Sequence, residues 1–90
     1  MDDKVTQIQI IPVKPKDGLV AFVSFTFDNS FYFSSIGIYT RLQGGYRLTY
    51  PTRKSFTTSL PIFHPINKEI ASMIEEAVIR KYEEIITGEL

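Results

Sequence analysis

The spacing of hydrophobic residues in this chain changes once, between Tyr50 and Asn67. Before this stretch, apolar and polar residues alternate with a period of two, as in strands that bury one face. After it, apolar residues recur every three or four positions, which is typical of an amphipathic helix. The sequence therefore predicts an α+β fold, with an antiparallel sheet of about four to five strands followed by one C-terminal amphipathic helix packed on the sheet.

Turn residues divide the first part of the chain into four predicted strands, at about residues 5–13, 19–27, 31–40 and 46–50. Between them lie three turn signals, Asp17-Gly18, Asp28-Asn29-Ser30 and Gln43-Gly44-Gly45. The polar stretch at residues 55–59 is either an ordered loop or an exposed edge strand, and its pattern does not separate the two.

Two irregularities are predicted within these strands. Pro12 cannot donate a hydrogen bond to a neighbouring strand, so the end of the first strand should lie at a sheet edge or at a bulge. In the third strand the apolar residues change from odd positions, at Phe31 and Phe33, to even positions further on. A bulge near Ser34-Ser35 would absorb the extra residue.

Residues 19–27 form the most hydrophobic stretch. Its odd-numbered residues are predicted on one face, and Val20, Phe22, Ser24 and Thr26 on the other. Because the second face also begins with apolar residues, we expect this strand at the centre of the sheet, with the helix on one face. The other face would suit a second subunit.

The helix is predicted over about residues 68–87, with Asn67 as its N-cap and Gly88 at its end. One stripe should face the sheet, made of Ile70, Met73, Ile74, Ala77, Val78, Lys81 or Tyr82, and Ile85. The charged residues Glu75, Glu76, Arg80, Glu83 and Glu84 should face water.

The composition limits the class of protein. Ninety residues fit a single domain, 1–90, and its small core favours oligomerisation. The absence of cysteine excludes disulfides and thiolate catalysis, and one histidine cannot make a metal site alone, so no metal or cofactor is expected. No apolar run is long enough to span a membrane and no secretory signal is evident, so we expect a cytoplasmic protein without membrane contact.

Charge is distributed unevenly along the chain, although the formal net charge is zero. Residues 4–54 carry seven Lys or Arg and two Asp, whereas residues 67–90 carry three Lys or Arg and six Glu. Binding to a phosphate backbone depends on local cation density, so a basic sheet region beside an acidic helix is compatible with it. An ordinary solvated surface would show the same distribution.

His64 is the only histidine, and its neighbours are Phe63 and Pro65. A general base needs a partner within hydrogen-bond reach, and the sequence offers none. We therefore predict a structural corner formed by His64, Pro65 and Asn67, where the sheet passes into the helix. No convergent acid–base pair can be assembled, so the sequence predicts that the protein is not an enzyme.

Aromatic residues offer a weaker indication. Phe22, Phe25, Phe27, Phe31 and Phe33 could form a platform for stacking bases, although core packing is the simpler interpretation. Aromatic residues next to cations are the better signal, and Tyr39-Thr40-Arg41 and Tyr46-Arg47 come nearest to it.

Several short motifs together resemble the SpoVG family of bacterial septation and sporulation regulators. The motifs that carry the resemblance are Asp17-Gly18, Thr26-Phe27-Asp28, Ile36-Gly37-Ile38, Gly45-Tyr46, Tyr50-Pro51-Thr52-Arg53-Lys54 and His64-Pro65-Ile66-Asn67, followed by a helix containing Lys81-Tyr82. The resemblance covers nearly the whole chain. The chain departs from the pattern at Gly37, where the family commonly has a basic residue, and between Ser55 and Phe63, which lacks the charged loop.

The resemblance implies a compact α+β fold, homodimers, and binding of DNA and RNA as a regulator, and by position it assigns the basic pair Arg53 and Lys54. Our first hypothesis is a dimeric nucleic-acid-binding regulator in which Arg41, Arg47 and Lys68 help this pair to contact phosphates. The second is a protein–protein interaction module of a division or regulatory complex, which would dock through a strand edge or the acidic helix face.

Overall fold

The computed structural model describes residues 4–88 and contains six strands and one helix. The elements are β1 Val5–Lys16, β2 Leu19–Phe27, β3 Phe31–Thr40, β4 Tyr46–Thr49, β5 Thr52–Ser55, β6 Thr58–Pro61 and α1 Lys68–Thr87. The first four strands form one antiparallel sheet in the order β1-β2-β3-β4, and β5 pairs only with β6. The predicted α+β class is confirmed.

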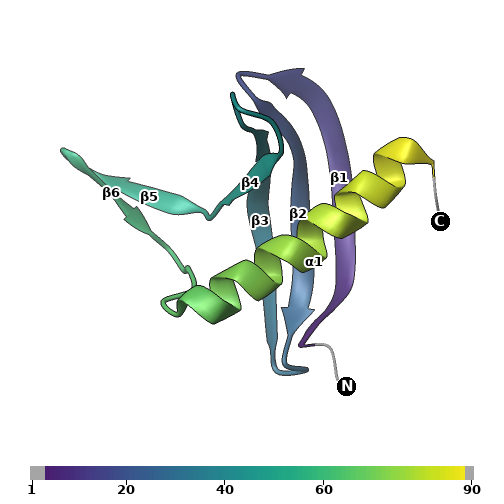
Figure 1. The fold of residues 1–90 in the computed structure, drawn as a ribbon. Helices are drawn as coiled ribbons and strands as arrows, with labels where there is room; N and C mark the ends of the chain where they lie inside the picture. The colour runs from purple at the N-terminus through teal and green to yellow at the C-terminus, as the bar shows by residue number, and fades with distance from the viewer. Residues whose placement is uncertain (1–3, 89–90) are drawn as a thin grey trace.

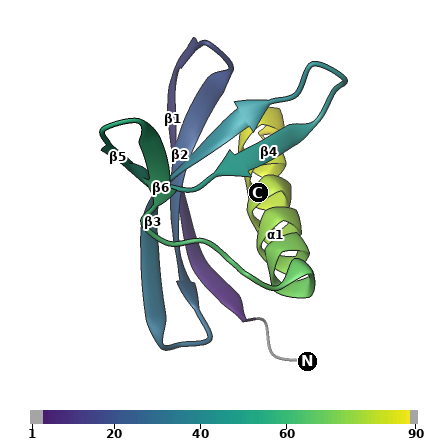
Figure 2. The same ribbon diagram turned by 90° about the vertical axis from the view of Figure 1, so that its left-hand side faces the viewer.

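The helix lies across one face of the sheet, and the β5–β6 hairpin extends away from both (Figure 1). We call β1–β4 with α1 the body, and residues 52–61 the arm. Seen from the side, α1 covers one face only, and no element of residues 4–88 covers the other (Figure 2). The body thus has two layers, as expected when a one-sided sheet and an amphipathic helix bury their apolar faces together.

The hydrophobic core lies between the sheet and the helix. Its buried residues come from every element of the body except β4, and they are Val5, Ala21, Val23, Phe25, Ile36, Ile38, Ile74, Val78 and Tyr82. Tyr46 and Leu48 of β4, and Tyr50 just after it, pack against this cluster. The alternation of β2 and the three–four spacing of the helix therefore predicted the core correctly at most positions.

The helix begins and ends where the sequence predicts. The Asn67 side-chain oxygen accepts hydrogen bonds from the backbone N–H groups of Glu69, at 2.8 Å, and Ile70, at 3.1 Å. Gly88 adopts the left-handed conformation, with φ of 78°, and its N–H bonds to the Ile85 carbonyl. The assignment of Met73 to the stripe that faces the sheet is wrong, because this residue is 38% exposed.

The predicted bulge near Ser34-Ser35 is confirmed. Val23 pairs with Ile36 and Phe25 with Phe33, so two residues of β3, Ser34 and Ser35, oppose one residue of β2, and Ser35 has a positive φ of 63°. A second bulge was not predicted: the pairing with β3 also shifts between Leu19 and Ala21.

This second bulge reverses the predicted faces at the start of β2. Val20 packs against the core, whereas Leu19 lies near Gly37, whose neighbours on both sides are buried in the core. The assignment of Leu19 to the helix-covered face and Val20 to the other was therefore wrong, because a one-residue shift exchanges the faces of a strand.

Two predicted strand boundaries also need correction. β1 continues to Lys16 rather than ending near residue 13. It is an edge strand and its pairing with β2 shifts between Pro12 and Lys16, so both the edge and the bulge predicted from Pro12 are present. Residues 55–59 are neither a loop nor one strand. They straddle the tip of the arm, with Ser55 ending β5 and Thr58 beginning β6.

Candidate nucleic-acid interface

The arm is a short hairpin held together by its own pairing. Arg53 pairs with Leu60 and Lys54 with Ser59, and the hydroxyl of Thr58 donates to the Ser55 carbonyl at 3.4 Å across the tip. At the base, the Ile62 N–H donates to the Pro51 carbonyl at 2.8 Å. Every residue of the arm is exposed.

Arg53 and Lys54 occupy adjacent positions of β5, so their side chains leave opposite faces of the hairpin. Neither takes part in an ion pair within residues 4–88. The arm therefore presents one unneutralised cation on each face, at a distance from the acidic residues of the helix. A two-stranded ribbon of this kind fits the major groove of B-DNA.

Arg41 lies elsewhere and is already engaged. Its Nε donates to the Tyr46 carbonyl at 3.1 Å, and its guanidinium lies 3.7 Å from a carboxylate oxygen of Glu75. Glu75 therefore does not simply face water, as the helical pattern predicted. It reaches the loop between β3 and β4 and neutralises Arg41 there.

Arg47 lies on the sheet face opposite the helix. Its guanidinium carbon is 5.1 Å from the centre of the Tyr39 ring, and its NH1 donates to the Thr49 hydroxyl at 3.2 Å. The Tyr39 ring in turn occupies the space beside Gly37, where an added Cβ would lie only 2.9 Å from the ring. Gly37 thus makes room for the ring that positions Arg47.

The five predicted cations therefore do not form one patch. Only Arg53 and Lys54 lie together. Lys68 is exposed at the start of α1, beside the N-cap Asn67, and the remaining two lie on opposite sides of the sheet. Sequence spacing could not reveal this separation, because it depends on which face each strand turns to the helix.

The predicted corner of His64, Pro65 and Asn67 lies between β6 and α1. The His64 Nδ1 lies 3.1 Å from the Pro65 carbonyl oxygen, and since a carbonyl only accepts, Nδ1 is the protonated nitrogen of this pair. His64 is exposed. The bond ties the ring to the backbone just before the helix begins.

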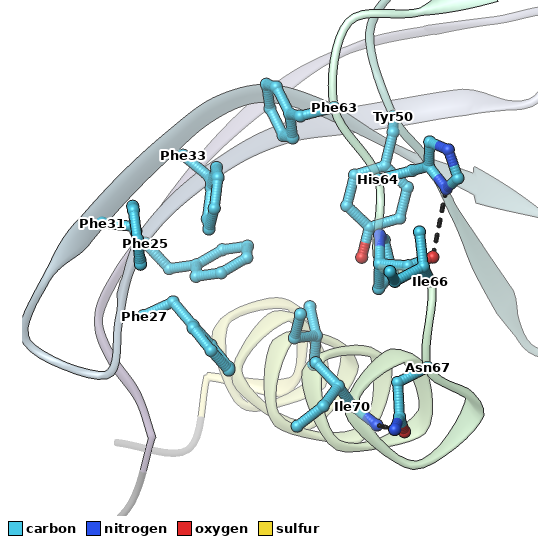
Figure 3. A pocket seen from close by; sticks show the side chains of 12 residues that line it. Phe25, Phe27, Phe31, Phe33, Tyr50, Phe63, His64, Ile66, Asn67 and Ile70 are labelled. Atoms are coloured by element: carbon cyan, nitrogen blue, oxygen red, sulfur yellow. Dashed lines mark hydrogen bonds between the residues drawn. The ribbon is translucent and has the colours of Figure 1, made fainter.

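An apolar cavity of about 390 Å³, which no sequence pattern indicated, lies at this corner. Its walls come from the ends of β2 and β3, the corner and the first turns of α1 (Figure 3). We call it the corner cavity; its aromatic residues are Phe25, Phe27, Phe31, Phe33, Tyr50 and Phe63. Of the five phenylalanines that the sequence singled out, Phe25 is buried in the core, whereas Phe31 is 59% exposed.

Two tyrosines of the body have altered acidity. Burial, with a further contribution from the Glu75 carboxylate, raises the pKa of Tyr50 from 10.0 to about 12. Burial, with a smaller contribution from Tyr46, also raises the pKa of Tyr82. Both remain neutral hydroxyls at physiological pH, so Tyr50 brings a polar but uncharged group to the corner cavity.

Two further observations on the part of the chain that the structure describes concern metal binding and membrane insertion. Within residues 4–88, no three His, Asp or Glu side chains lie close enough to hold a metal ion. The single helix of this part of the chain is not apolar enough to cross a membrane.

A small α+β protein with one exposed basic hairpin is the class that these observations define. The family model SpoVG matches residues 3–84. Three relatives, each named "Putative septation protein SpoVG", are similar to most of the chain. The protein of Caldicellulosiruptor saccharolyticus is 38% identical over 94% of this chain and 97% of its own length. Those of Acetivibrio thermocellus and Bdellovibrio bacteriovorus are each 35% identical, over 94% and 89% of this chain and 90% and 73% of their own lengths. The chain belongs to the SpoVG family.

Proposed function

We propose that this protein is a non-enzymatic regulator of septation or sporulation that binds DNA or RNA as a homodimer, with the arm as its main contact. The observation that carries the proposal is the arm itself, which presents Arg53 and Lys54 unpaired on opposite faces. Cations contribute to nucleic-acid affinity by displacing the counterions of the phosphates. The relatives' names, which refer to septation, support the regulatory process.

Dimerisation has support from the uncovered face of the sheet. Ile11, Phe22 and Tyr32 are 64%, 40% and 69% exposed there. They line a shallow hollow of about 350 Å³ together with Gln9 and serine residues. Covering this face with a second copy would bury these side chains and would double the number of arms. A protein with zero net charge needs such local concentration of cations to hold a phosphate backbone.

The test is the salt dependence of binding to single-stranded and duplex DNA and RNA. The affinity of the wild type should fall steeply with salt. The double change Arg53→Ala with Lys54→Ala should reduce the slope of log K against log salt by about 0.7 to 0.9 for each lost contact. Lys14→Ala with Lys16→Ala removes the same charge from the opposite edge of the sheet, and it should leave the slope nearly unchanged.

Two results would contradict the proposal. One is the absence of binding to any of these nucleic acids at low salt. The other is an equal loss of slope in both double variants, which would mean that total charge and not the arm governs binding.

A second candidate function is docking of a division or regulatory protein, and the same exposed apolar face favours it. In that case a partner captured by the protein would survive nuclease treatment and the Arg53→Ala, Lys54→Ala change, but would be lost on Phe22→Ser. A partner lost with nuclease would favour the first function.

A further inference from the structure

We propose that the corner cavity accepts one unstacked base of a single-stranded nucleic acid whose phosphates are held by the arm. This inference rests on the proposed function and adds to it the class of nucleic acid and the residues that read it. Four observations support it, namely the shape of the cavity, its aromatic rings, its polar groups and its position among the cations.

The cavity is deep enough and apolar enough for a planar ring. Its volume of about 390 Å³ lies in the range of small-molecule sites, and nearly all of its lining is aromatic or aliphatic. Phe25 forms part of the floor, while Ile70 and Ile74 of α1 form the wall opposite the sheet.

The rings on the sheet side form a nearly parallel series. Phe31 and Phe33 are inclined by 17° with ring centres 6.1 Å apart, and Phe33 and Phe63 by 30° at 4.9 Å. Phe31, at the outer end, is 59% exposed, so folding leaves most of its apolar surface in contact with water. A base that stacks on Phe31 would cover this ring. Aromatic faces of this kind are how single-stranded nucleic acid is bound without a strict sequence requirement.

Polar groups are few and lie where the edge of a base could meet them. The Tyr50 hydroxyl points toward the cavity (Figure 3). The Pro65 carbonyl occupies the Nδ1 of His64, and in the neutral ring Nε2 then remains as an acceptor. Asn67 uses its oxygen to cap α1, so its amide NH₂ remains as a donor. Donors and acceptors without a fixed partner suit the varied edges of bases.

Cations flank the cavity along the chain on both sides. Tyr50 lies two positions before the arm and Phe63 two positions after it, so Arg53 is three residues from the cavity wall along the chain. Lys68 comes directly after Asn67 at the other side. The nearby Glu75 carboxylate is paired with Arg41, so it does not leave an unpaired negative charge beside the site. Aromatic rings between cations are the arrangement that single strands require.

The experiment uses the full chain and single-stranded oligonucleotides that carry one 2-aminopurine, whose fluorescence is quenched by stacking. Phe31→Ala is the test variant, since an exposed ring can be removed without opening the core. Leu42→Ala is the control, because Leu42 is 107% exposed in the loop between β3 and β4 and lines neither the corner cavity nor the hollow on the uncovered face.

Wild-type protein should quench the fluorescence. Phe31→Ala should abolish the quenching and weaken single-strand binding about 5- to 150-fold, the range found when a stacking residue is removed. Its salt slope and its affinity for duplex should not change. Leu42→Ala should alter single-strand affinity by less than about twofold.

Three outcomes would overturn the inference. If binding depends on Arg53 and Lys54 but is insensitive to Phe31→Ala, the cavity is not a base site and the proposed function still stands. If wild-type protein binds no nucleic acid at low salt, both fall. The third outcome is that Phe31→Ala converts a dimer to monomers in analytical ultracentrifugation while the affinity for single strands stays unchanged. In that case a second copy of the chain, and not a base, fills the cavity.

Discussion

The body and the arm are built from the same kind of antiparallel pairing, but they differ in what holds them. In the body, β2 and β3 contribute five fully or nearly fully buried side chains that pack against α1. In the arm, every residue of both strands is exposed, and large apolar side chains such as Phe56, at 106%, meet only solvent. An isolated two-stranded hairpin is marginally stable at best. The arm therefore adds little to folding, and its side chains are free to serve binding.

The largest expected effect compares two phenylalanines. Phe25→Ala removes a fully buried ring and should lower the free energy of unfolding by about 3–5 kcal/mol, whereas Phe56→Ala at the tip of the arm should change it by less than about 0.5 kcal/mol. Urea denaturation followed by circular dichroism measures both. Similar losses in the two variants would show that the arm is packed and would remove the distinction.

The next effect concerns the corner where the arm rejoins the body. Asn67→Ala removes the cap that satisfies two backbone N–H groups of α1, and it should cost about 1 kcal/mol of unfolding free energy. Asn67→Asp keeps an acceptor oxygen and should cost only a few tenths. If the alanine and aspartate variants are equally stable in thermal unfolding, the helix does not depend on this cap.

Alkaline pH tests the other junction, at Tyr50. Its pKa in the folded state is about 12, above the ordinary 10.0, so the native state favours the neutral hydroxyl. The resulting stability is complete below pH 10 and is lost as the pH rises toward 12. After allowance for solvent screening we expect a loss on the order of 1 kcal/mol that Tyr50→Phe does not show. Parallel stability profiles of the two proteins in urea would refute the assignment of Tyr50 to the packed body.

The smallest effect separates two arginines. Arg41→Ala breaks a half-exposed ion pair with Glu75, so it should lower the unfolding free energy by about 0.2–0.5 kcal/mol and leave nucleic-acid affinity unchanged at moderate salt. Arg53→Ala should do the reverse. Stability and binding should be measured on both variants. If Arg41→Ala lowers the nucleic-acid affinity and Arg53→Ala does not, Arg41 and not the arm contacts the phosphates.

Much of the body could be predicted because burial determines its pattern. The core positions of β2, the bulge at Ser34-Ser35 and both ends of α1 follow from local periodicity, turn chemistry and capping. The errors arose where one residue shifts a register. The bulge after Leu19 exchanges two side chains between faces, and nothing in the short apolar run at the start of β2 indicates it.

The site was harder to predict than the fold, because it depends on contacts between distant segments. Arg53 and Lys54 could be singled out as adjacent cations, but the pairing of Arg41 with Glu75 across 34 positions of sequence could not. The corner cavity likewise joins the end of β2 and the start of β3 to Phe63 and the start of α1, and each part taken alone resembles core. Only the tertiary arrangement shows that these rings enclose space.

The most direct test is to remove the arm. Since Ile62 N–H already bonds to the Pro51 carbonyl at 2.8 Å, a two-residue Asn-Gly turn can replace Thr52–Pro61 and connect the two. The measurement is the affinity of this folded variant for single-stranded and duplex nucleic acid across a series of salt concentrations. We predict an unfolding free energy within about 0.5 kcal/mol of wild type and the loss of salt-dependent binding. Wild-type affinity and slope in the variant without the arm would contradict the account.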